Sequence, residues 1–335
     1  MKIAFVHKGL RSFVKKDLEI LQNHFSVQQI EYDPRKGIWN NLKQQFRLFW
    51  HSIVLIPFVD LIYIWFAGYH SFLPVLIGKL FRKKIVVALG GYETTYIPEI
   101  QYGVFSNPLR SFCARFTFNQ ADLLLPVDET LIFNLKQFMP RFNTPYTVLD
   151  FGYDGQFWYR TRPKKGIVLT VATLNSEIVF KRKGIDLFVE ACKQLPEFQF
   201  HVVGVEAAVH HLFPELPNLI LSPGANPEQL REYYSEAKVY AQFSMYEGFP
   251  NVVCEGMLCE CIPVVAAVNG MPRQVGDCGI VLKERSVQEA VRAIRYAMNL
   301  PEARGKQCRE RVIKHFPVDK RETLLIKLIE EIKKG

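Results

Sequence analysis

The segment Ser244–Val265, SMYEGFPNVVCEGMLCECIPVV, combines residue types that can bind an anion. Pro250 suits the first position of a helix, which makes Phe249 the expected cap residue. The backbone N–H groups of Gly248–Asn251 then lie at a helix N-terminus, where the helix dipole favours anions. Gly248 has no side chain and lets the backbone approach a ligand closely. The segment therefore predicts a phosphate site at the start of a helix.

Two carboxylates accompany this helix start. Glu247 precedes the turn, and Glu255 lies about one and a half turns into the helix. Carboxylates so placed can accept hydrogen bonds from hydroxyls at two points along an extended ligand. Together with the helix N-terminus they favour a site for a sugar joined to a nucleotide through a diphosphate. A capped amphipathic helix with exposed acids has the same residues, so both interpretations stay open at this point.

Other catalytic patterns are absent from the sequence. It contains no Walker A pattern, no G-x-G-x-x-G and no G-x-S-x-G. It has no Asp-x-Asp pair for a divalent cation, and Cys259 and Cys261 have no second pair at zinc spacing. We expect no metal and no cofactor, and we expect all 7 cysteines to be buried thiols in a reducing compartment.

The elements that must position these residues alternate between strand and helix. Continuous apolar strands indicate parallel sheets covered by helices, so we expect an α/β fold with two doubly wound, Rossmann-like domains facing across a cleft. The expected strands are 2–7, 26–31, 61–66, 84–89, 121–126 and 147–149, then 167–173, 199–203, 219–221, 239–243, 262–266 and 279–281. The expected helices are 12–24 and 39–57, then 185–195, 227–237, 250–259, 287–300 and 319–334.

Length and composition agree with two globular domains. The chain has 335 residues, of which 49% are hydrophobic and 22% charged, which excludes a mainly disordered chain. The polar, basic stretch 154–165, DGQFWYRTRPKK, is the expected linker. We therefore expect domains over 1–153 and 166–316, with the C-terminal helix at about 317–335 packing back on the first domain.

Most of the formal net charge of +9 belongs to the first quarter of the chain. Residues 1–86 contain 13 Lys and Arg but 5 Asp and Glu, and the helix expected at 39–57 carries both basic and aromatic residues. This pattern suggests an anionic partner such as a membrane surface, although a solvated basic face would look the same. The apolar stretch 61–78 is interrupted by Gly68, His70, Ser71 and Pro74, so we interpret it as a strand, a loop and a short helix.

The second half resembles the family 4 retaining glycosyltransferases, which have the GT-B fold. Glu247–Glu255 is similar to the E-x7-E motif of that family, and 255–265 is similar to its E-A-M-A-C-G-x-P-V-V run. Further likeness, in the family's order, is found in 148–157 (VLDFGYDGQF), 183–186 (KGID), 202–204 (VVG) and 270–272 (GMP).

The resemblance implies roles for residues of the donor site. Lys183 would neutralise the donor diphosphate, Glu255 would hold the ribose hydroxyls, and Glu247 would hold the donor sugar and position its anomeric carbon. Lys183 and Glu247 are therefore the expected catalytic residues. The other residues expected at the donor are Thr173, Arg182, Gly204, Gly224, Gly248, Phe249, Pro250 and Asn251.

The chain departs from the family pattern in one place that bears on the diphosphate. The family has Gly-Arg after the strand that enters the second domain, whereas this chain has Thr173-Leu174. An apparent insertion, 175–182, follows, and Arg182 or Lys181 is the expected replacement for the missing charge.

The first domain offers candidates for acceptor binding after its strands. Many family members carry a His where this chain has Gly90 and Gly91, so no catalytic His is transferred. The candidates, each of which is also compatible with an ordinary strand-end turn, are Gly9, Leu10, His70, Gly90, Gly91, Tyr92 and Glu93.

The resemblance implies a metal-independent transfer, with retention, of a hexose-type sugar from a UDP- or GDP-sugar to a saccharide or lipid-linked acceptor in surface glycan biosynthesis. The leaving diphosphate would itself take the acceptor proton. The alternatives are a GT-B sugar epimerase and a non-catalytic nucleotide-sugar-binding protein. We expect a cytoplasmic protein, peripheral at the inner face of the membrane, that binds no nucleic acid, since no basic motif with interleaved aromatic residues is present.

Overall fold

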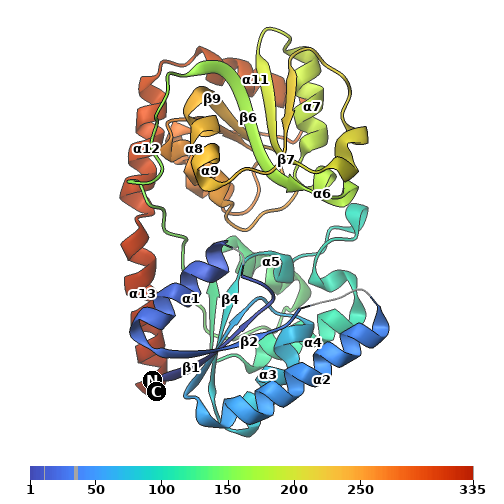
Figure 1. The fold of residues 1–335 in the computed structure, drawn as a ribbon, viewed down its shortest axis with the longest axis vertical. Coiled ribbons are helices and arrows are strands. Elements are labelled where there is room, and N and C mark those ends of the chain that lie inside the picture. Colours follow the sequence, from blue (N-terminus) through green and yellow to red (C-terminus); the bar gives the residue numbers. More distant parts are fainter. Residues whose placement is uncertain (11, 34–36, 335) are drawn as a thin grey trace. The chain divides into compact units, whose positions relative to one another are not determined.

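The chain is described here from a computed structural model that covers residues 1–10, 12–33 and 37–334 (Figure 1). It divides into two compact units, of which the first comprises residues 1–151 and 319–335 and the second residues 152–318. The stretch 154–165, where the sequence predicts a linker, falls within the second unit. Arg11, Arg35 and Lys36, which contribute to the basic surplus of the first quarter, lie outside the described residues.

The first unit is built on a parallel sheet. Its strand order is β2-β1-β3-β4-β5 in the described residues, with Ile3 of β1 paired with Val27 on one side and Leu61 on the other. Nearly all residues of β1, β3, β4 and β5 are buried, which suits strands covered on both faces. The strands are β1 (Lys2–His7), β2 (Ser26–Glu31), β3 (Leu61–Trp65), β4 (Lys84–Leu89) and β5 (Leu123–Pro126).

The helices of the first unit cover both faces of this sheet. Right-handed crossovers place α1 on one face and α2, α3 and α4 on the other, where α3 packs between α2 and α4 (Figure 1). The helices are α1 (Ser12–His24), α2 (Ile38–Leu55), α3 (Tyr69–Leu80), α4 (Pro108–Gln120), α5 (Thr130–Phe138) and α13 (Val318–Lys334), with short 3-10 turns η1 (Ile56–Phe58), η2 (Tyr92–Thr94), η3 (Pro98–Ile100) and η4 (Val104–Ser106).

The second unit repeats the architecture with a larger parallel sheet. Its strand order in the described residues is β11-β10-β9-β6-β7-β8. The strands are β6 (Lys165–Leu174), β7 (Gln199–Val205), β8 (Leu219–Ser222), β9 (Ala237–Gln242), β10 (Ile262–Val265) and β11 (Ile280–Val281).

Two groups of helices pack on this second sheet. α7 packs against α11, while α8, α10 and α12 pack against α9. The helices are α6 (Glu177–Arg182), α7 (Ile185–Gln194), α8 (Pro227–Glu236), α9 (Asn251–Leu258), α10 (Met271–Val275), α11 (Val287–Asn299) and α12 (Ala303–His315), with 3-10 turns η5 (Ala207–Leu212) and η6 (Gly276–Cys278).

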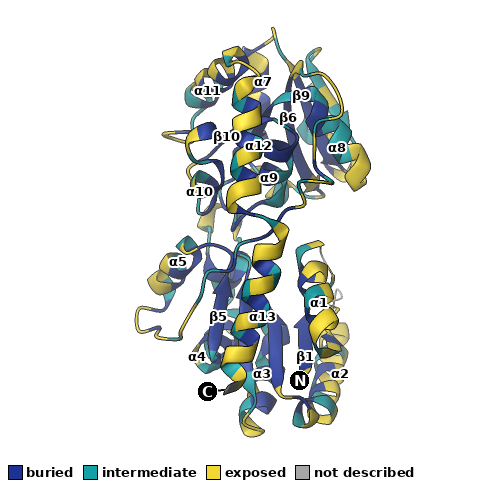
Figure 2. Cartoon of the chain, turned by 90° about the vertical axis from the view of Figure 1, so that its left-hand side faces the viewer, coloured by how far each residue is buried: buried dark blue, intermediate teal, exposed yellow. Residues whose placement is uncertain are grey.

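Each unit has its own apolar core. Figure 2 shows dark blue, buried strands inside each unit and yellow, exposed residues on the outer sides of the helices. The largest fully buried side chains include Phe5, Tyr63 and Trp65 in the first unit and Phe188 and Phe200 in the second. The 7 cysteines, all of them within the described residues, are free and buried, as predicted.

Most predicted elements are found within one or two residues of their expected bounds, with exceptions. The predicted strand 147–149 is wrong: Thr147 and Leu149 donate single backbone hydrogen bonds to the edge of β5 without forming a strand. Helices α4, α5, α6, α10 and α12 were not predicted. The stretch 61–78 forms β3 and most of α3, as interpreted from the sequence. Across the described residues, each helix falls short of the length or the hydropathy that crossing a bilayer requires.

Candidate functional site

The predicted donor residues gather at the carboxyl edge of the second sheet. β6 and β9 are neighbours, but the chain continues from β6 to β7 on one side and from β9 to β10 on the other. In open α/β sheets, ligands bind outside the carboxyl ends of the strands at such a reversal of strand order. Lys183 follows β6 and Glu247 follows β9, so the topology brings both residues to this point.

Glu247 contacts two cations there. Its Oε1 accepts hydrogen bonds from Lys183 Nζ at 2.5 Å, from Arg182 Nη1 at 3.4 Å and from Ser244 Oγ at 3.1 Å. The exposed fractions of the three charged side chains are 16% for Lys183, 13% for Arg182 and 12% for Glu247. Burial acts to raise the pKa of Glu247, but the charges of Lys183 and Arg182 outweigh it and lower that pKa. The site is therefore an ionised acid with two cations and carries a net positive charge.

A tight turn at Gly184 positions Lys183. Lys183 caps the end of α6, and Gly184 adopts the left-handed conformation with φ of 72° before α7 begins. A Cβ atom at Gly184 would lie 2.0 Å from the carbonyl oxygen of Phe243, so only glycine lets this turn approach the end of β9. Met245 N also donates to Arg182 O at 2.8 Å. These contacts connect the loop after β6 to the loop after β9.

The structure separates the two replacements proposed for the missing arginine. Arg182 Nη1 donates to the carbonyl oxygen of Tyr246 at 3.3 Å as well as to Glu247, so its side chain lies in the site. Lys181 forms an exposed ion pair with Glu177, one turn away on the same helix, at 2.8 Å. The apparent insertion is the helix α6, which places Arg182 and not Lys181 beside Glu247.

The loop after β10 fixes the backbone of the Glu247 turn. Asn269 Nδ2 donates to the carbonyl oxygen of Glu247 at 2.5 Å, and Gly270 N donates to Gly248 O at 3.2 Å. Sequence reasoning missed Asn269 and Ser244. The signal that could have found them is position, because each follows the end of a neighbouring parallel strand by two to four residues.

Helix α9 begins one residue later than predicted. Pro250 is the N-cap, with φ of −69° and ψ of 119°, so its extended ψ lies outside the helix and Phe249 is not the cap. The side chain of Phe249 is buried, 5.2 Å from the ring of Phe316, which leaves only its backbone for a ligand. Asn251 accepts a hydrogen bond from Tyr153 Oη at its Oδ1, at 3.0 Å.

Glu255 lies on α9 and is partly buried. Its Oε2 accepts a hydrogen bond from the hydroxyl of Tyr234 at 3.3 Å. Tyr234 is fully buried, and burial together with the charge of Glu255 raises its pKa well above the ordinary value. Tyr234 therefore remains a neutral donor that orients the Glu255 carboxylate.

Three more predicted donor residues lie at the ends of β6, β7 and β8. Thr173 is exposed near the end of β6. Gly204, with φ of 101°, packs so closely that a Cβ atom would lie 2.2 Å from Ala172 O. Gly224 follows β8, two strands away from β6, and open space surrounds the position of its Cβ. All three share the carboxyl edge with Glu247, with Gly224 the most distant in strand order.

The predicted acceptor residues share the carboxyl edge of the first sheet. Strand order reverses there between β1 and β3, and Gly9 and Leu10 follow β1, while His70 lies on α3 just after β3. The remaining candidates, Gly90, Gly91, Tyr92 and Glu93, follow β4.

Hydrogen bonds within the first unit occupy three of these side chains. His70 Nε2 donates to Trp65 O at 2.8 Å, and burial lowers the His70 pKa to about 4. Glu93 Oε1 accepts from Gly90 N at 2.6 Å and Gly91 N at 3.3 Å, and burial raises the Glu93 pKa to about 7. The Tyr92 hydroxyl accepts from Arg110. These three side chains shape the loops of this edge.

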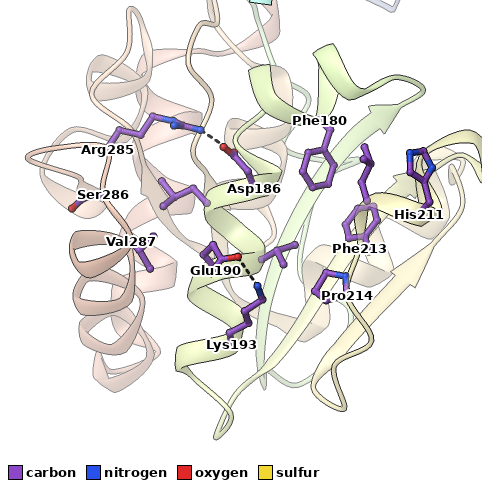
Figure 3. A pocket seen from close by; sticks show the side chains of 13 residues that line it. Phe180, Asp186, Glu190, Lys193, His211, Phe213, Pro214, Arg285, Ser286 and Val287 are labelled. Atoms are coloured by element: carbon purple, nitrogen blue, oxygen red, sulfur yellow. Dashed lines mark hydrogen bonds and ion pairs between the residues drawn. The ribbon is translucent and has the colours of Figure 1, made fainter. Parts of the chain in front are cut away.

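A separate hollow of about 640 Å³ lies beside α7 in the second unit (Figure 3). Figure 3 shows Asp186 paired with Arg285 at 3.0 Å and Glu190 paired with Lys193 at 2.6 Å along its wall. Its lining contains none of the predicted site residues, so it is not part of the cluster around Glu247. Over the described part of the chain, no three His, Cys, Asp or Glu side chains are grouped to hold a metal ion.

Comparisons with known proteins show that part of the chain is similar to one family and that the whole chain is similar in fold to solved structures. Residues 159–315 match the family model described as Glycosyl transferases group 1. One subunit of the phosphatidylinositol N-acetylglucosaminyltransferase of Arabidopsis thaliana is 29% identical over 150 residues, which are 42% of this chain. The matched part covers 33% of that relative, so the chain spans about a third of its length.

Three solved structures are similar over almost the whole chain. A sucrose-phosphate synthase from Thermosynechococcus elongatus has a TM-score of 0.80 at 16% identity. The matched region covers 99% of this chain and 98% of the synthase. The HepE protein of Anabaena, in complex with UDP-glucose, has a TM-score of 0.76 at 15% identity, with coverage of 99% and 100%. An E. coli structure described as trehalose-6-phosphate bound with UDP-2-fluoro glucose has a TM-score of 0.73 at 10% identity, with coverage of 100% and 99%. The predicted fold class, two parallel-sheet α/β domains as in GT-B proteins, is confirmed.

Proposed function

We propose that this chain is a group 1 glycosyltransferase that moves a hexose-type sugar from a nucleoside diphosphate sugar to an acceptor, with retention at the anomeric carbon. One observation carries the proposal: Lys183 and Arg182 meet Glu247 at the reversal of strand order in the second sheet. This cluster lies within the residues that match the family model.

The cluster suits a diphosphate. Two cations share a single carboxylate there, so the site has positive charge in excess. Lys183 is a mobile point charge, and Arg182 offers a planar fork of donors for phosphate oxygens. The N-terminus of α9, which follows Pro250, adds backbone N–H groups oriented toward an anion.

Glu247 and Glu255 complete the donor site in this proposal. A bound diphosphate draws Lys183 and Arg182 toward its own oxygens, which leaves the Glu247 carboxylate to accept hydrogen bonds from the hydroxyls of the donor sugar. Glu255, oriented by Tyr234, holds the ribose hydroxyls. UDP-sugars are the favoured donors, because two of the similar structures hold UDP-glucose or UDP-2-fluoro glucose.

The transfer itself needs stabilisation of the leaving diphosphate. Charge develops on the diphosphate as the glycosidic bond breaks. Lys183 and Arg182, once the bound diphosphate has drawn them to its oxygens, stabilise that charge together with the α9 N-terminus. The leaving oxygen takes the proton of the acceptor hydroxyl on the same face of the sugar, which gives retention. No metal ion takes part in this scheme.

The acceptor is a saccharide or a lipid-linked saccharide of surface glycan biosynthesis, bound by the first unit. The curated relative, whose name specifies phosphatidylinositol, supports a lipid-linked acceptor. Gly9, Leu10 and the Gly90–Glu93 turn, at the carboxyl edge of the first sheet, are the residues proposed to contact it. The protein then acts in the cytoplasm, at the inner face of the membrane.

A ligand panel tests the donor site. Thermal unfolding is measured with UDP, GDP, ADP and TDP and their sugar conjugates, with and without EDTA. A donor at a hundred times its dissociation constant adds about 2.7 kcal/mol of stability. Lys183→Ala should abolish the shift, and its matched control Lys181→Ala, which removes an exposed lysine two residues away, should retain it. Equal shifts in both variants would contradict the role of Lys183.

Turnover separates transfer from the alternatives. Release of nucleoside diphosphate that depends on an added saccharide or lipid-linked saccharide supports a transferase. Conversion of the donor sugar without any acceptor identifies an epimerase, and binding without turnover identifies a nucleotide-sugar-binding protein.

A further inference from the structure

Helix α2 has a second apolar face that no described part of its own unit covers. Its inner face, with Leu48 and Ser52 buried, packs on the unit. Its outer face carries apolar side chains at spacings of three and four residues, which places them in one stripe along the helix. The stripe, with its exposed fractions, consists of Trp39 (78%), Leu42 (54%), Phe46 (65%), Trp50 (50%) and Ile53 (37%).

The stripe continues beyond the helix, and one of its sides is basic. Phe58, in the 3-10 turn that follows α2, is 74% exposed. Lys43 and Arg47 are both exposed beside the stripe, and on a helical projection they lie on the same flank of it. The stretch 34–59 contains no Asp or Glu, and the acid that precedes it is Asp33. An exposed apolar stripe with a cationic flank and no acid is typical of helices that lie in a lipid–water interface.

We propose that α2 is the membrane-docking element of this protein and that it lies flat on a bilayer containing anionic lipids. The apolar stripe inserts into the boundary between headgroups and acyl chains, where Trp is favoured, and Lys43 and Arg47 bind headgroup phosphates. The helix docks and does not span, because it lacks the hydropathy of a membrane span. A second copy of the chain fits less well, since antiparallel two-fold pairing of α2 would bring its cationic flank against an identical one.

Vesicle flotation of the full chain tests the apolar stripe. Vesicles of phosphatidylcholine with about 30 mol% phosphatidylglycerol should carry the protein upward, whereas pure phosphatidylcholine should carry little of it. Phe46→Gln with Trp50→Gln should lower the partition coefficient at least about tenfold. The control pair is Phe133→Gln with Tyr296→Gln, which removes two aromatic residues of similar exposure (57% and 58%) from α5 and α11 and should float like the original chain.

Charge reversal tests the basic flank. Lys43→Glu with Arg47→Glu should lower the partition coefficient about tenfold at about 0.1 M salt, and less at higher salt. Lys306→Glu with Lys314→Glu, both exposed on α12, changes the net charge equally and should float normally. An equal loss of vesicle binding in both pairs of variants would show that the net charge of the protein, and not this helix, drives the binding. That result would overturn the proposal.

Tryptophan fluorescence reports on the helix directly. Of the 4 tryptophans, Trp39 and Trp50 are exposed in the stripe, whereas Trp65 and Trp158 are buried. Vesicle binding should shift the emission to shorter wavelength and protect it from acrylamide, and Trp39→Phe with Trp50→Phe should remove that response while flotation persists.

Two results would overturn the membrane-docking proposal and leave the proposed donor site unaffected. One is a chain that binds a nucleotide sugar but does not float with anionic vesicles. The other is a dimer that forms without lipid and that Phe46→Gln with Trp50→Gln dissociates in sedimentation velocity. The proposed donor site is tested independently, by thermal unfolding with the panel of nucleotides.

Discussion

Glu247 is the residue on which the proposed donor site depends, because its carboxylate binds both cations of the cluster. Its burial is tolerated only because Lys183, Arg182 and Ser244 all donate to it. A ligand with two phosphates competes for the same donors. The acid and the diphosphate are thus alternative partners of one pair of cations.

Glu247→Gln is expected to separate catalysis from nucleotide binding. The amide cannot balance the two cations, so nucleoside diphosphate affinity should stay equal or rise, while turnover should fall at least about a hundredfold because the donor sugar loses its carboxylate partner. Steady-state kinetics and calorimetric titration of the diphosphate measure the two effects. Glu177→Gln, which removes an exposed acid from α6, serves as control and should change neither. Normal turnover in Glu247→Gln would contradict its role.

Glu93 makes stability depend on pH in the first unit. Its pKa is about 7 in the folded protein, against an ordinary value of 4.5, because burial disfavours the carboxylate. The folded state therefore holds the proton more tightly than the unfolded chain does. The stability that this provides is present in full below pH 4.5 and is lost as the pH rises through 7, on the order of 3 kcal/mol in all.

Glu93→Gln should remove this pH dependence. The amide oxygen still accepts from Gly90 N and Gly91 N, and no charge has to be buried at high pH. Urea unfolding is measured at pH values from 4 to 8. The free energy of unfolding of the variant should rise relative to that of the original chain as the pH rises. Glu99→Gln removes an exposed acid nearby and should leave the profile unchanged. A Glu93→Gln profile parallel to that of the original chain would refute the assignment.

At the scale of elements, the positions of Arg182 and Lys183 depend on the junction between α6 and α7. α6 delivers Arg182 and Lys183, and Gly184 turns the chain so that α7 can pack on the sheet. The carbonyl oxygen of Phe243, at the end of β9, occupies the space that a side chain at position 184 would need. The junction is therefore a close contact between two loops of the site.

Gly184→Ala should disturb this junction. The positive φ and the close approach to Phe243 O together should cost about 1–3 kcal/mol of unfolding free energy and displace Lys183, which weakens nucleotide binding. Denaturant unfolding and the nucleotide thermal shift measure the two effects. Gly224→Ala is the matched control for stability, because its Cβ would meet open space. Equal stability of the two variants would contradict the close contact.

At the scale of the whole molecule, the two ends of the chain belong to the same unit. Arg321 on α13 is buried and donates to both carboxylate oxygens of Asp17, at 2.7 Å and 2.8 Å, 304 residues away in sequence. It also donates to the carbonyl oxygens of Leu149 and Asp150, and Asp17 accepts further hydrogen bonds from Tyr63 and Trp65. The C-terminal helix thus completes the first unit.

Arg321→Leu should destabilise the first unit strongly. It leaves the Asp17 carboxylate buried without its cation, which costs about 3–5 kcal/mol. Urea unfolding should show the transition of the first unit moved to lower denaturant, with the second unit unchanged. Lys327→Ala, on the exposed side of α13, should shift stability by less than about 0.5 kcal/mol. A loss from Arg321→Leu no larger than that of Lys327→Ala would show that α13 is not required.

The sequence by itself determined the alternation of strands and helices, and it singled out Lys183, Arg182 and Glu247, which the structure brings together. Strand apolarity is local information, and the Glu247–Glu255 segment follows a strand and opens a helix in one continuous stretch. Helices α4, α5 and α12 escaped prediction because polar and apolar residues mix in them, so that their pattern is weak without the surfaces on which they pack.

Only the tertiary structure decided which charged side chains form ion pairs with each other. Lys181 and Arg182 are adjacent in sequence, but the helical turn directs one toward Glu177 and the other toward Glu247. Asn269 joins the site because the loops after β9 and β10 lie side by side, and Ser244 meets Glu247 within the loop after β9. The side chains of His70 and Glu93 form hydrogen bonds with nearby backbone groups, of Trp65 at the end of β3 and of Gly90 just after β4. These pairings depend on strand order and register, which the alternation of elements leaves open.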